Sequence, residues 1–532
     1  MKVSICQINP VLGDLDYNFS IIKKNYEEAI SKGSQLVIFP ELAITGYPPQ
    51  DLLYDSSFIE RNLAILENIA SFATVPLIVG FVRKSDFLHN SAALCENGKV
   101  VQTYDKILLP NYDVFDEKRY FTPGTDPEVW EINGKKVGIQ ICEDLWDQKY
   151  DFKVSQRQKE IGAELLVNIS ASPYNEGKID ERYELICEKV KLLKTPYIYC
   201  NMVGGQDEII YDGSSLFINS KNEVVAQGKL FEEDILFFDI NDKSTKDISK
   251  YNIDEEKYKA LCLGLKDYVS KTGHSKAVIG LSGGIDSSLV ACIAADSLGS
   301  ENVLGISMPS KFSSDHSLND AQLLSDNLGI KYIRIRIEDI VEQYEKTLHP
   351  FFKNENRDVT EENIQARIRG DILMAVSNKF GHIVLSTGNK TELALGYCTL
   401  YGDMSGGLSV IADLSKLEVY SMANWKNKSS DNLVVPQNCI DKPASAELSP
   451  NQVDPFDYNI VSPLVDEIIE HGATIENLVS RYPSNLVHEI VNKIRLNEYK
   501  RRQAAPSLRV SSKAFGVGRR FPIVNKFQYN KK

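Results

Sequence analysis

The sequence contains no run of about 18 apolar residues, the length that a membrane-spanning helix needs. Residues 1–8 have the pattern of a first strand and not that of a signal peptide. The nine cysteines are scattered without paired spacing or neighbouring histidines, which argues against a disulfide framework and against a zinc site. We therefore expect a cytoplasmic protein that does not bind membranes and whose cysteines are mostly small buried hydrophobes.

Positive charge is also scarce, because 60 lysines and arginines face 73 aspartates and glutamates and leave a net charge of −13. Non-specific affinity for nucleic acid depends on positive charge, so no nucleic-acid partner is expected. Residues 495–532 are an exception, with eleven basic residues against one acid, Glu498. A solvated tail would explain this arm. Its interior, residues 506–515, mixes apolar and turn residues with the charge, which favours a folded loop that reaches an anionic ligand.

The length of 532 residues predicts two or three domains. In the first 240 residues, strand-like apolar runs alternate with amphipathic stretches, as in an α/β domain. Strands are expected at 3–8, 36–39, 77–82, 137–141, 165–169, 197–200, 215–218, 223–226 and 235–240, with helices at 17–32 and 181–193. Residues 241–249 are polar and have no apolar period, so we interpret them as a linker.

A second alternation follows a helix expected at 254–271. Further strands are predicted at 302–307, 331–335 and 382–386, with helices at 315–327 and 360–380. This pattern is typical of a doubly wound parallel α/β sheet, whose ligands bind at the carboxyl ends of its strands. The predicted organisation is therefore two α/β domains, 1–242 and 254–532, joined by a linker at 243–253.

A glycine loop at 280–288 lies between an apolar run at 276–279 and a stretch with the composition of a buried helix, 289–295. Gly283 and Gly284 permit a positive φ and a close approach to an anion, and the following helix offers unpaired N–H groups. The loop is thus predicted to hold phosphates. It has Asp286 where a P-loop has lysine, so a divalent ion joining that carboxylate to a pyrophosphate is expected, which points to adenylation chemistry.

Cys142 directly follows the expected strand 137–141, and a lone cysteine in such a place is more often structural. Two other strand ends change that interpretation, because Glu41 and Lys106 supply a carboxylate and an ammonium there. Together the three offer a nucleophile, a base and a cation for attack on an amide carbonyl. We expect Lys106 to stabilise the thiolate, and lowering a cysteine pKa by about two units takes roughly 2.7 kcal/mol.

Glu41, Lys106 and Cys142, in this order and with these neighbours, resemble the triad of the nitrilase or carbon–nitrogen hydrolase superfamily over residues 1–240. The resemblance implies an α-β-β-α sandwich. It also implies that Glu117 orients the lysine. Tyr112, Ser172 and Lys178 match positions that hold the amide substrate in glutamine-using members, although an ordinary loop would explain the last two.

Residues 282–288 resemble the PP-loop of the N-type ATP pyrophosphatases, which activate an oxygen with AMP before a nitrogen attacks. Segments 362–370, 386–392, 401–407 and 501–513 resemble NAD synthetases, and with the amidase half in front the chain resembles the glutamine-dependent NAD synthetase family from end to end. The ATP contacts that this implies are Gly280, Leu281, Ser282, Gly283, Gly284, Ile285, Asp286, Ser287, Thr387 and Lys390. Asp286 and Glu392 would bind Mg²⁺, and Asn363, Glu392 and Lys513 would contact the dinucleotide.

Arg367 and Arg369 are two positions apart on an expected helix, so they should face different directions and not share one ligand. The activity that the resemblance implies uses L-glutamine, ATP and nicotinic acid adenine dinucleotide to make NAD in a homo-oligomer. Two rivals stay open: a PP-loop amidotransferase with another acceptor, and a nucleotide-binding sensor that no longer turns over. The intact nucleophile Cys142 argues against the sensor.

Overall fold

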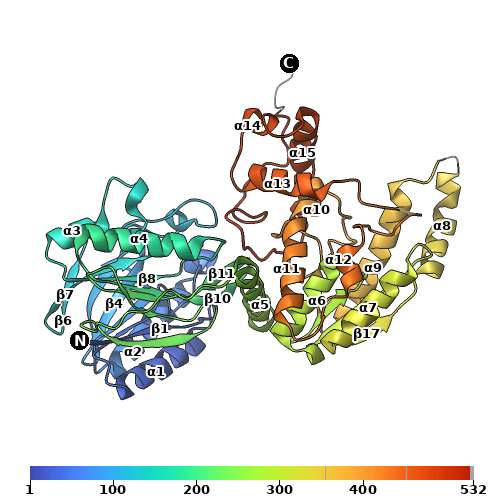
Figure 1. Cartoon of the computed structure of the whole chain (residues 1–532). Coiled ribbons are helices and arrows are strands. Elements are labelled where there is room, and N and C mark those ends of the chain that lie inside the picture. Colours follow the sequence, from blue (N-terminus) through green and yellow to red (C-terminus); the bar gives the residue numbers. More distant parts are fainter. Residues whose placement is uncertain (354, 451, 528–532) are drawn as a thin grey trace. The chain divides into compact units, whose positions relative to one another are not determined.

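The computed structural model describes residues 1–353, 355–450 and 452–527. It divides into two compact units, Met1–Tyr251 and Asn252–Lys532, which are treated separately below (Figure 1). Among the described residues, no helix has both the length and the apolarity to cross a membrane. The expected linker is held on the first unit, since Lys246 N donates to Val224 O at 2.9 Å and Ser249 N donates to Gln227 Oε1 at 2.7 Å.

The first unit is built on two six-stranded sheets. The first has the order β14 (Asp234–Asp239), β1 (Lys2–Gln7), β2 (Leu36–Ile38), β3 (Leu77–Lys84), β4 (Leu88–Glu96) and β5 (Lys99–Asp105). The second has the order β13 (Val224–Gln227), β12 (Leu216–Ile218), β9 (Tyr197–Asn201), β8 (Leu165–Ser170), β7 (Lys135–Ile141) and β6 (Val129–Ile132). Strands β10 (Val203–Gln206) and β11 (Ile209–Asp212) form a separate two-stranded hairpin in this unit.

Alternating side chains along the strands build the layers of this unit. Ile5 and Ile139, from the two sheets, belong to one apolar core, while Val37 points the other way onto helices. Helices α1 (Leu15–Ser31) and α2 (Ser56–Phe72) cover the first sheet. Helices α3 (Val154–Glu160) and α4 (Lys178–Leu193) cover the second. The expected α-β-β-α sandwich is confirmed.

Strand β4 was not predicted, although it is almost entirely buried. Its apolar pattern is interrupted by His89, Asn90 and Ser91, which are buried because each has a polar partner. Asn90 donates to the Glu41 carboxylate and Ser91 donates to Asp105. A strand that carries buried polar side chains for a site does not show the simple alternation from which strands are predicted.

The second unit contains a five-stranded sheet in which every neighbouring pair is parallel. Its order is β17 (Lys331–Arg334), β16 (Val303–Ser307), β15 (Ala277–Gly280), β18 (Ile383–Ser386) and β19 (Leu408–Ser409). The helices around it include α5 (Ile253–Lys271), α6 (Ile285–Leu298), α7 (Asp315–Leu328), α8 (Glu338–Phe352), α9 (Val359–Phe380) and α11 (Lys416–Ser429). The predicted doubly wound sheet is confirmed, and its order reverses at β15, directly before the glycine loop.

A helical cluster that was not predicted packs beside this sheet. It comprises α10 (Lys390–Leu395), α13 (Tyr458–Ile469), α14 (Ile475–Val479), α15 (Ser484–Leu496) and α16 (Glu498–Arg501). Leu393, Leu464 and Ile490 share one apolar core there. The described part of the basic arm is folded, as expected: Ser507 bridges Ser409 at the sheet edge, and Arg501 donates to the carbonyls of Leu393 and Ala394.

Candidate active sites

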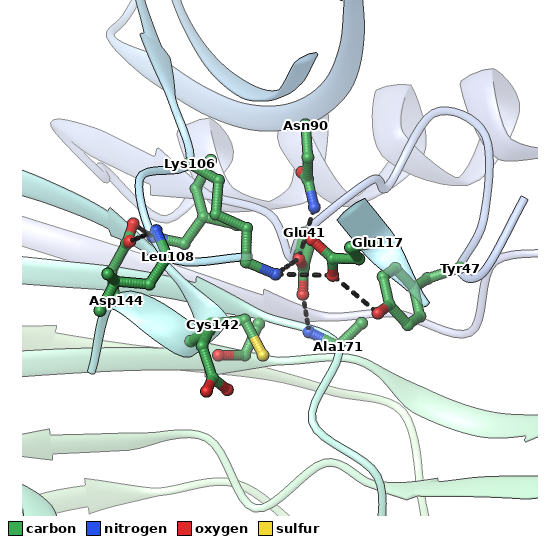
Figure 2. A network of polar contacts seen from close by, with 12 residues as sticks. Glu41, Tyr47, Asn90, Lys106, Leu108, Glu117, Cys142, Asp144 and Ala171 are labelled. Atoms are coloured by element: carbon green, nitrogen blue, oxygen red, sulfur yellow. Dashed lines mark hydrogen bonds and ion pairs between the residues drawn. The ribbon is translucent and has the colours of Figure 1, made fainter. Parts of the chain in front are cut away.

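Three strand ends of the first unit converge on one buried cluster (Figure 2). Glu41 follows β2, Lys106 follows β5, and Cys142 follows β7, so the cluster draws on both sheets. Their exposed fractions are 0%, 1% and 4%, respectively. The structure thus brings together the three side chains that the sequence predicted as nucleophile, base and cation.

Lys106 is held between two carboxylates. Its Nζ donates to Glu41 Oε1 and to Glu117 Oε1, each at 2.7 Å. Tyr47 supports the second of these, because its hydroxyl donates to Glu117 Oε1 at 2.7 Å. This geometry is what an orienting role for Glu117 requires, and Tyr47 is a further member that the sequence did not indicate.

Glu41 has donors on both carboxylate oxygens. Asn90 Nδ2 donates to Oε1 and the backbone N–H of Ala171 donates to Oε2, both at 2.7 Å. Figure 2 shows the thiol of Cys142 beside this network, next to the Glu41 carboxylate. The fixed orientation of Glu41 suits a base that exchanges a proton with the thiol.

Burial governs the protonation of this cluster. It raises the pKa of Cys142 well above its usual value, the Glu41 carboxylate raises it further, and Lys106 opposes both. Burial alone would lower the pKa of Lys106, but Glu117 and Glu41 raise it well above the ordinary value. Burial raises the pKa of Glu117 to about 7 against the pull of Lys106.

Lys106 lowers the pKa of Cys142, as a cation that stabilises a thiolate should, but burial and the Glu41 carboxylate outweigh it in the protein without substrate. The ammonium also lies between Glu41 and Glu117, whose negative charges act on the thiol in the opposite sense, and the dry surroundings disfavour a thiolate. Cys142 is a thiol at rest, with a carboxylate beside it to accept the proton.

Tyr112 and Lys178, two of the residues expected to contact an amide substrate, lie within electrostatic reach of Cys142. Tyr112 is half-exposed, and its hydroxyl donates at 2.9 Å to Glu143 Oε2. Glu143 is the buried neighbour of Cys142 and accepts a second hydroxyl, that of Tyr150, at 2.9 Å. Burial raises the pKa of Glu143.

Ser172 lies on the loop between β8 and α4, and Lys178 is the first residue of α4. Ser172 is buried, its N–H donates to Asn201 Oδ1 at 2.9 Å, and its hydroxyl lies 3.4 Å from Arg182 Nη2. Lys178 Nζ pairs with Glu181 at 2.9 Å and lies 3.6 Å from the ring centre of Trp146. Burial lowers the pKa of Lys178.

A cavity of about 300 Å³ lies at the carboxyl end of β15 in the second unit. Its lining includes these residues predicted for ATP and metal: Gly280, Leu281, Ser282, Gly284, Ile285, Asp286, Ser287, Thr387 and Glu392. Gly283 is needed for the backbone, because its φ is +75° and a Cβ there would approach Ser317 O to 2.1 Å. Gly284 N donates to Ser282 Oγ at 3.2 Å, which fixes the turn before α6.

Asp286 and Glu392 face the same ammonium. Lys416 Nζ donates to Asp286 Oδ2 at 2.5 Å and to Glu392 Oε1 at 3.2 Å. Asn389 Nδ2 donates to Asp286 Oδ1 at 2.8 Å, and Asn389 and Glu392 cap the start of α10 reciprocally. Burial raises the pKa of Glu392 to about 7, with Lys416 opposing and Asp286 adding to the rise.

Sequence reasoning did not identify Lys416 or Asn389. The Asn-x-x-Glu pattern of a capping box was present at 389–392 and could have indicated Asn389. Among the residues that the structure describes, no group of three or more His, Cys, Asp or Glu side chains could hold a metal. Asp286 and Glu392 are two of the acidic residues that line this cavity, and both contact Lys416.

Lys390 is not part of the cavity lining. It is completely buried, and its Nζ pairs with Glu470 at 2.7 Å, Asp466 at 3.3 Å and Asp413 at 3.5 Å. As the first residue of α10 it points into the unit while Glu392 faces the cavity. Three carboxylates hold this ammonium in the structure, and the ATP contact expected of Lys390 stays a prediction.

Asn363 and Lys513 also lie off the cavity lining. Asn363 Oδ1 accepts from Thr399 Oγ1 at 2.6 Å, and Lys513 is half-buried. The two arginines of α9 diverge as expected: Arg369 lines the cavity, whereas Arg367 is exposed and donates to Leu400 O at 3.2 Å. Burial lowers the pKa of Arg369 to about 10.

The buried cysteine, glutamate and lysine of an α-β-β-α sandwich define a thiol amidohydrolase, and the glycine loop at the reversal point of a parallel sheet defines a nucleotide-binding unit. The family described as carbon–nitrogen hydrolase matches residues 2–250, and the one described as NAD synthase matches residues 257–504. The chain belongs to the glutamine-dependent NAD(+) synthetase family.

Similarity to members of this family extends along the whole chain. The chain is 41% identical to the glutamine-dependent NAD(+) synthetase of Thermotoga maritima and 42% identical to that of Synechocystis sp., with 99% of each chain covered in both cases. The solved structure of the enzyme from Acinetobacter baumannii in complex with ADP is 36% identical, with a TM-score of 0.81 and 98% of each chain covered.

Proposed function

We propose that this chain is a glutamine-hydrolysing NAD(+) synthase, which amidates nicotinic acid adenine dinucleotide with ammonia released from L-glutamine. The observation that carries the proposal is the presence, in one chain, of a buried Cys142, Glu41 and Lys106 cluster and of a glycine-loop cavity. The family resemblance along both units supports the pairing of these two sites, and the ADP bound to a relative supports an adenine nucleotide in the second.

In the first unit, Cys142 Sγ attacks the side-chain amide carbon of glutamine as its proton passes to Glu41. The oxyanion that forms is stabilised by the Lys106 ammonium. Collapse of this intermediate breaks the C–N bond, and the leaving nitrogen takes the proton from Glu41 to depart as ammonia. Water, activated by Glu41, then hydrolyses the thioester to glutamate and regenerates the thiol. Tyr112, Ser172 and Lys178 are proposed to contact glutamine.

In the second unit, the glycine loop and the start of α6 hold the phosphates of ATP through backbone N–H groups. The nicotinate carboxylate attacks the α-phosphorus, which releases pyrophosphate and leaves an acyl adenylate. Ammonia attacks the acyl carbon, the bond to AMP breaks, and NAD is formed. Asn363, Glu392 and Lys513 are proposed to contact the dinucleotide. The family resemblance also leads us to propose a homo-oligomer, which a mass measurement of the assembly would test.

Mg²⁺ fits the pair of carboxylates in the cavity. Asp286 and Glu392 both lie against the single cation of Lys416, so their oxygens already converge on a position of positive charge, and oxygen donors suit this metal. We propose that these two side chains hold it, and when bound it would neutralise charge on the triphosphate.

Replacing the nucleophile separates the two nitrogen sources. With Cys142→Ala, NAD formation from glutamine should fall by roughly 10⁴-fold or more, since loss of a nucleophile removes the covalent route. NAD formation from added ammonia should stay at the wild-type rate, because the second unit keeps its residues. Both rates are measured on the purified full chain with ATP and nicotinic acid adenine dinucleotide.

Cys187→Ala is the matched control, because Cys187 is another buried cysteine of the first unit. It should leave both rates unchanged. Loss of the ammonia-driven rate in Cys142→Ala would show that the thiol has been assigned the wrong role. Failure of the wild-type protein to make NAD from either nitrogen source would overturn the proposed acceptor.

A further inference from the structure

Asp144 has a fully buried carboxylate two residues after the nucleophile. It accepts four hydrogen bonds: Oδ1 accepts the N–H groups of Leu108 at 2.9 Å and Ile107 at 3.2 Å, and Oδ2 accepts Ile141 N–H at 2.9 Å and the Tyr104 hydroxyl at 2.8 Å. Figure 2 shows the Asp144 and Leu108 contact beside the catalytic cluster. All four donors point at a group that the proposed reaction does not use.

The position of these donors along the chain is informative. Ile107 and Leu108 directly follow Lys106, and Ile141 directly precedes Cys142. Strand β5 belongs to the first sheet and β7 to the second, so no backbone ladder joins the two. Asp144 therefore links, through one rigid carboxylate, the strand end that carries the ammonium to the strand end that carries the thiol.

The backbone of Cys142 needs support of this kind. Its φ is +43°, in the left-handed region that residues with a Cβ adopt rarely. Asp144 closes the turn by accepting the N–H of Ile141, and Asn168 Nδ2 donates to Cys142 O at 3.3 Å on the other side. Such conformations persist where the surrounding structure fixes them, and they gather at active sites.

We propose that Asp144 is a positioning residue for glutamine hydrolysis, which sets Cys142 against Lys106 by binding the backbone next to each. The proposal rests on the proposed function of the first unit. In the described part of the chain, no hydrogen bond or ion pair joins Asp144 to Glu41, Lys106 or Glu117, although burial raises the pKa of Asp144 and the charge of Lys106 opposes that rise. Three of its four hydrogen bonds come from backbone N–H groups beside Lys106 and Cys142, so the role assigned to it is geometric and not the transfer of a proton.

The test uses Asp144→Asn in the full chain. Asparagine keeps the shape of aspartate, but one of its two terminal groups is an NH₂ donor. This donor must face either the N–H of Ile141 or the N–H groups of Ile107 and Leu108. The hydrogen bonds to whichever strand end it faces are lost. We expect the kcat for glutamine hydrolysis to fall by about 100-fold, the effect of a displacement near 1 Å in a reacting pair. The KM for glutamine, the pH profile of kcat and the ammonia-driven rate should be unchanged.

Tyr104→Phe is the matched variant, because it removes one of the four donors and leaves the three backbone bonds in place. It should lower kcat by about fivefold with an unchanged KM, the size of one lost hydrogen bond. This variant keeps the proposal testable if Asp144→Asn fails to fold, which thermal unfolding would reveal.

Three results would overturn the proposal: an unchanged kcat in both variants, a rise in KM with kcat preserved, or loss of one arm of the pH profile in Asp144→Asn. The first would show a merely structural aspartate, the second a substrate contact and the third a proton carrier. Wild-type protein that releases no glutamate from glutamine would instead refute the proposed function, so the two failures are distinct.

Discussion

Cys142 illustrates at the residue scale how burial and charge compete. The ammonium of Lys106 favours a thiolate, but desolvation and the Glu41 carboxylate favour the thiol, and the thiol prevails. In the proposed mechanism the thiol stays unreactive until a substrate amide is present, and it loses its proton to Glu41 as it attacks. The chain has nine cysteines. Because Cys142 is a thiol at rest, it should react slowly with electrophiles other than the substrate.

The pH dependence of alkylation tests this state. Since the pKa of Cys142 is raised well above 9, only a small thiolate fraction exists at neutral pH, and that fraction grows tenfold with each pH unit. We expect the rate of iodoacetamide labelling at Cys142, measured by peptide mass spectrometry, to rise by about tenfold per unit from pH 6 to 9 without a plateau.

The same peptide from protein unfolded in guanidinium chloride is the control. Its labelling rate should level off above a pH of about 8.5, the ordinary pKa of a cysteine. A plateau below pH 8 in the folded protein would contradict the resting thiol and would restore the thiolate that the sequence first suggested.

Individual site residues were predictable where a charged or nucleophilic side chain ends an apolar run. Glu41 and Cys142 met that condition. Lys106 follows the mixed strand β5, and Asp286 follows the glycine loop, so these two depended on the resemblance to known motifs. Asn90, Asp144 and Lys416 did not meet the condition, because their partners lie far away in sequence and a polar residue inside an apolar stretch carries no sign of its role. Lys390 has the chemical type of a phosphate ligand, and its burial among carboxylates could not be predicted from the sequence, because Asp413, Asp466 and Glu470 lie far from it along the chain.

At the scale of elements, the short helix α10 contacts both the nucleotide cavity and a cluster of buried carboxylates. Its capping residue Glu392 lines the nucleotide cavity and Asn389 donates to Asp286 there, while Lys390 points to Asp413, Asp466 and Glu470. Asp413 in turn accepts the backbone N–H groups of 510 and 511 in the C-terminal arm. One turn of helix thus joins the cavity wall to the arm.

Removal of the Lys390 ammonium should be costly. Lys390→Met leaves buried carboxylates without their cation, and breaking such a buried pair destabilises a protein by about 3–5 kcal/mol. We expect a clear fall in the free energy of unfolding, measured by urea titration of the full chain. The direct loss of affinity for ATP that a phosphate ligand would show should be absent in whatever protein remains folded.

The control is Lys346→Met on α8, where Lys346 pairs with Glu342 at 3.9 Å on the surface. Exposed pairs of this kind contribute less than about 0.5 kcal/mol, so stability should hardly change. Equal stability of the two variants would contradict the buried ion-pair cluster around Lys390.

Most of the elements could be predicted because they bury one uniform face. The parallel strands β15, β16 and β18 are apolar runs bounded by turns, and α9 begins at a capping box. The helices α13, α14 and α15 were not predicted. The helix α14 has only five residues, and prolines interrupt the helical pattern at Pro463 inside α13 and at Pro483 before α15. Strand β4 was not predicted because its buried side chains are partly polar and interrupt the apolar pattern.

At the scale of the whole molecule, two chemistries are assigned to two compact units, and each can be removed alone. Asp286→Asn should lower the rate of NAD formation from both glutamine and ammonia by roughly 10²-fold or more. The reason is that the substitution removes a charge that the triphosphate site needs. Glutamine hydrolysis should continue, and glutamate release measures it.

This result is the mirror image of Cys142→Ala, which loses glutamine use and keeps ammonia use. Ser421→Ala, on the outer part of α11, is a control that removes a surface hydroxyl paired with Asp254 at 2.8 Å. Retention of ammonia-driven synthesis by Asp286→Asn would contradict the role of the glycine-loop cavity in adenylation.

The charge cluster of the first unit also bears on the departure of the product. Glu41 and Glu117 share the single ammonium of Lys106, so carboxylates outnumber the cation in a site with little water. A neutral amide enters this field without repulsion, whereas hydrolysis turns it into a carboxylate that both glutamates repel. We therefore expect the residues proposed to start the reaction also to favour the release of glutamate, which would weaken product inhibition.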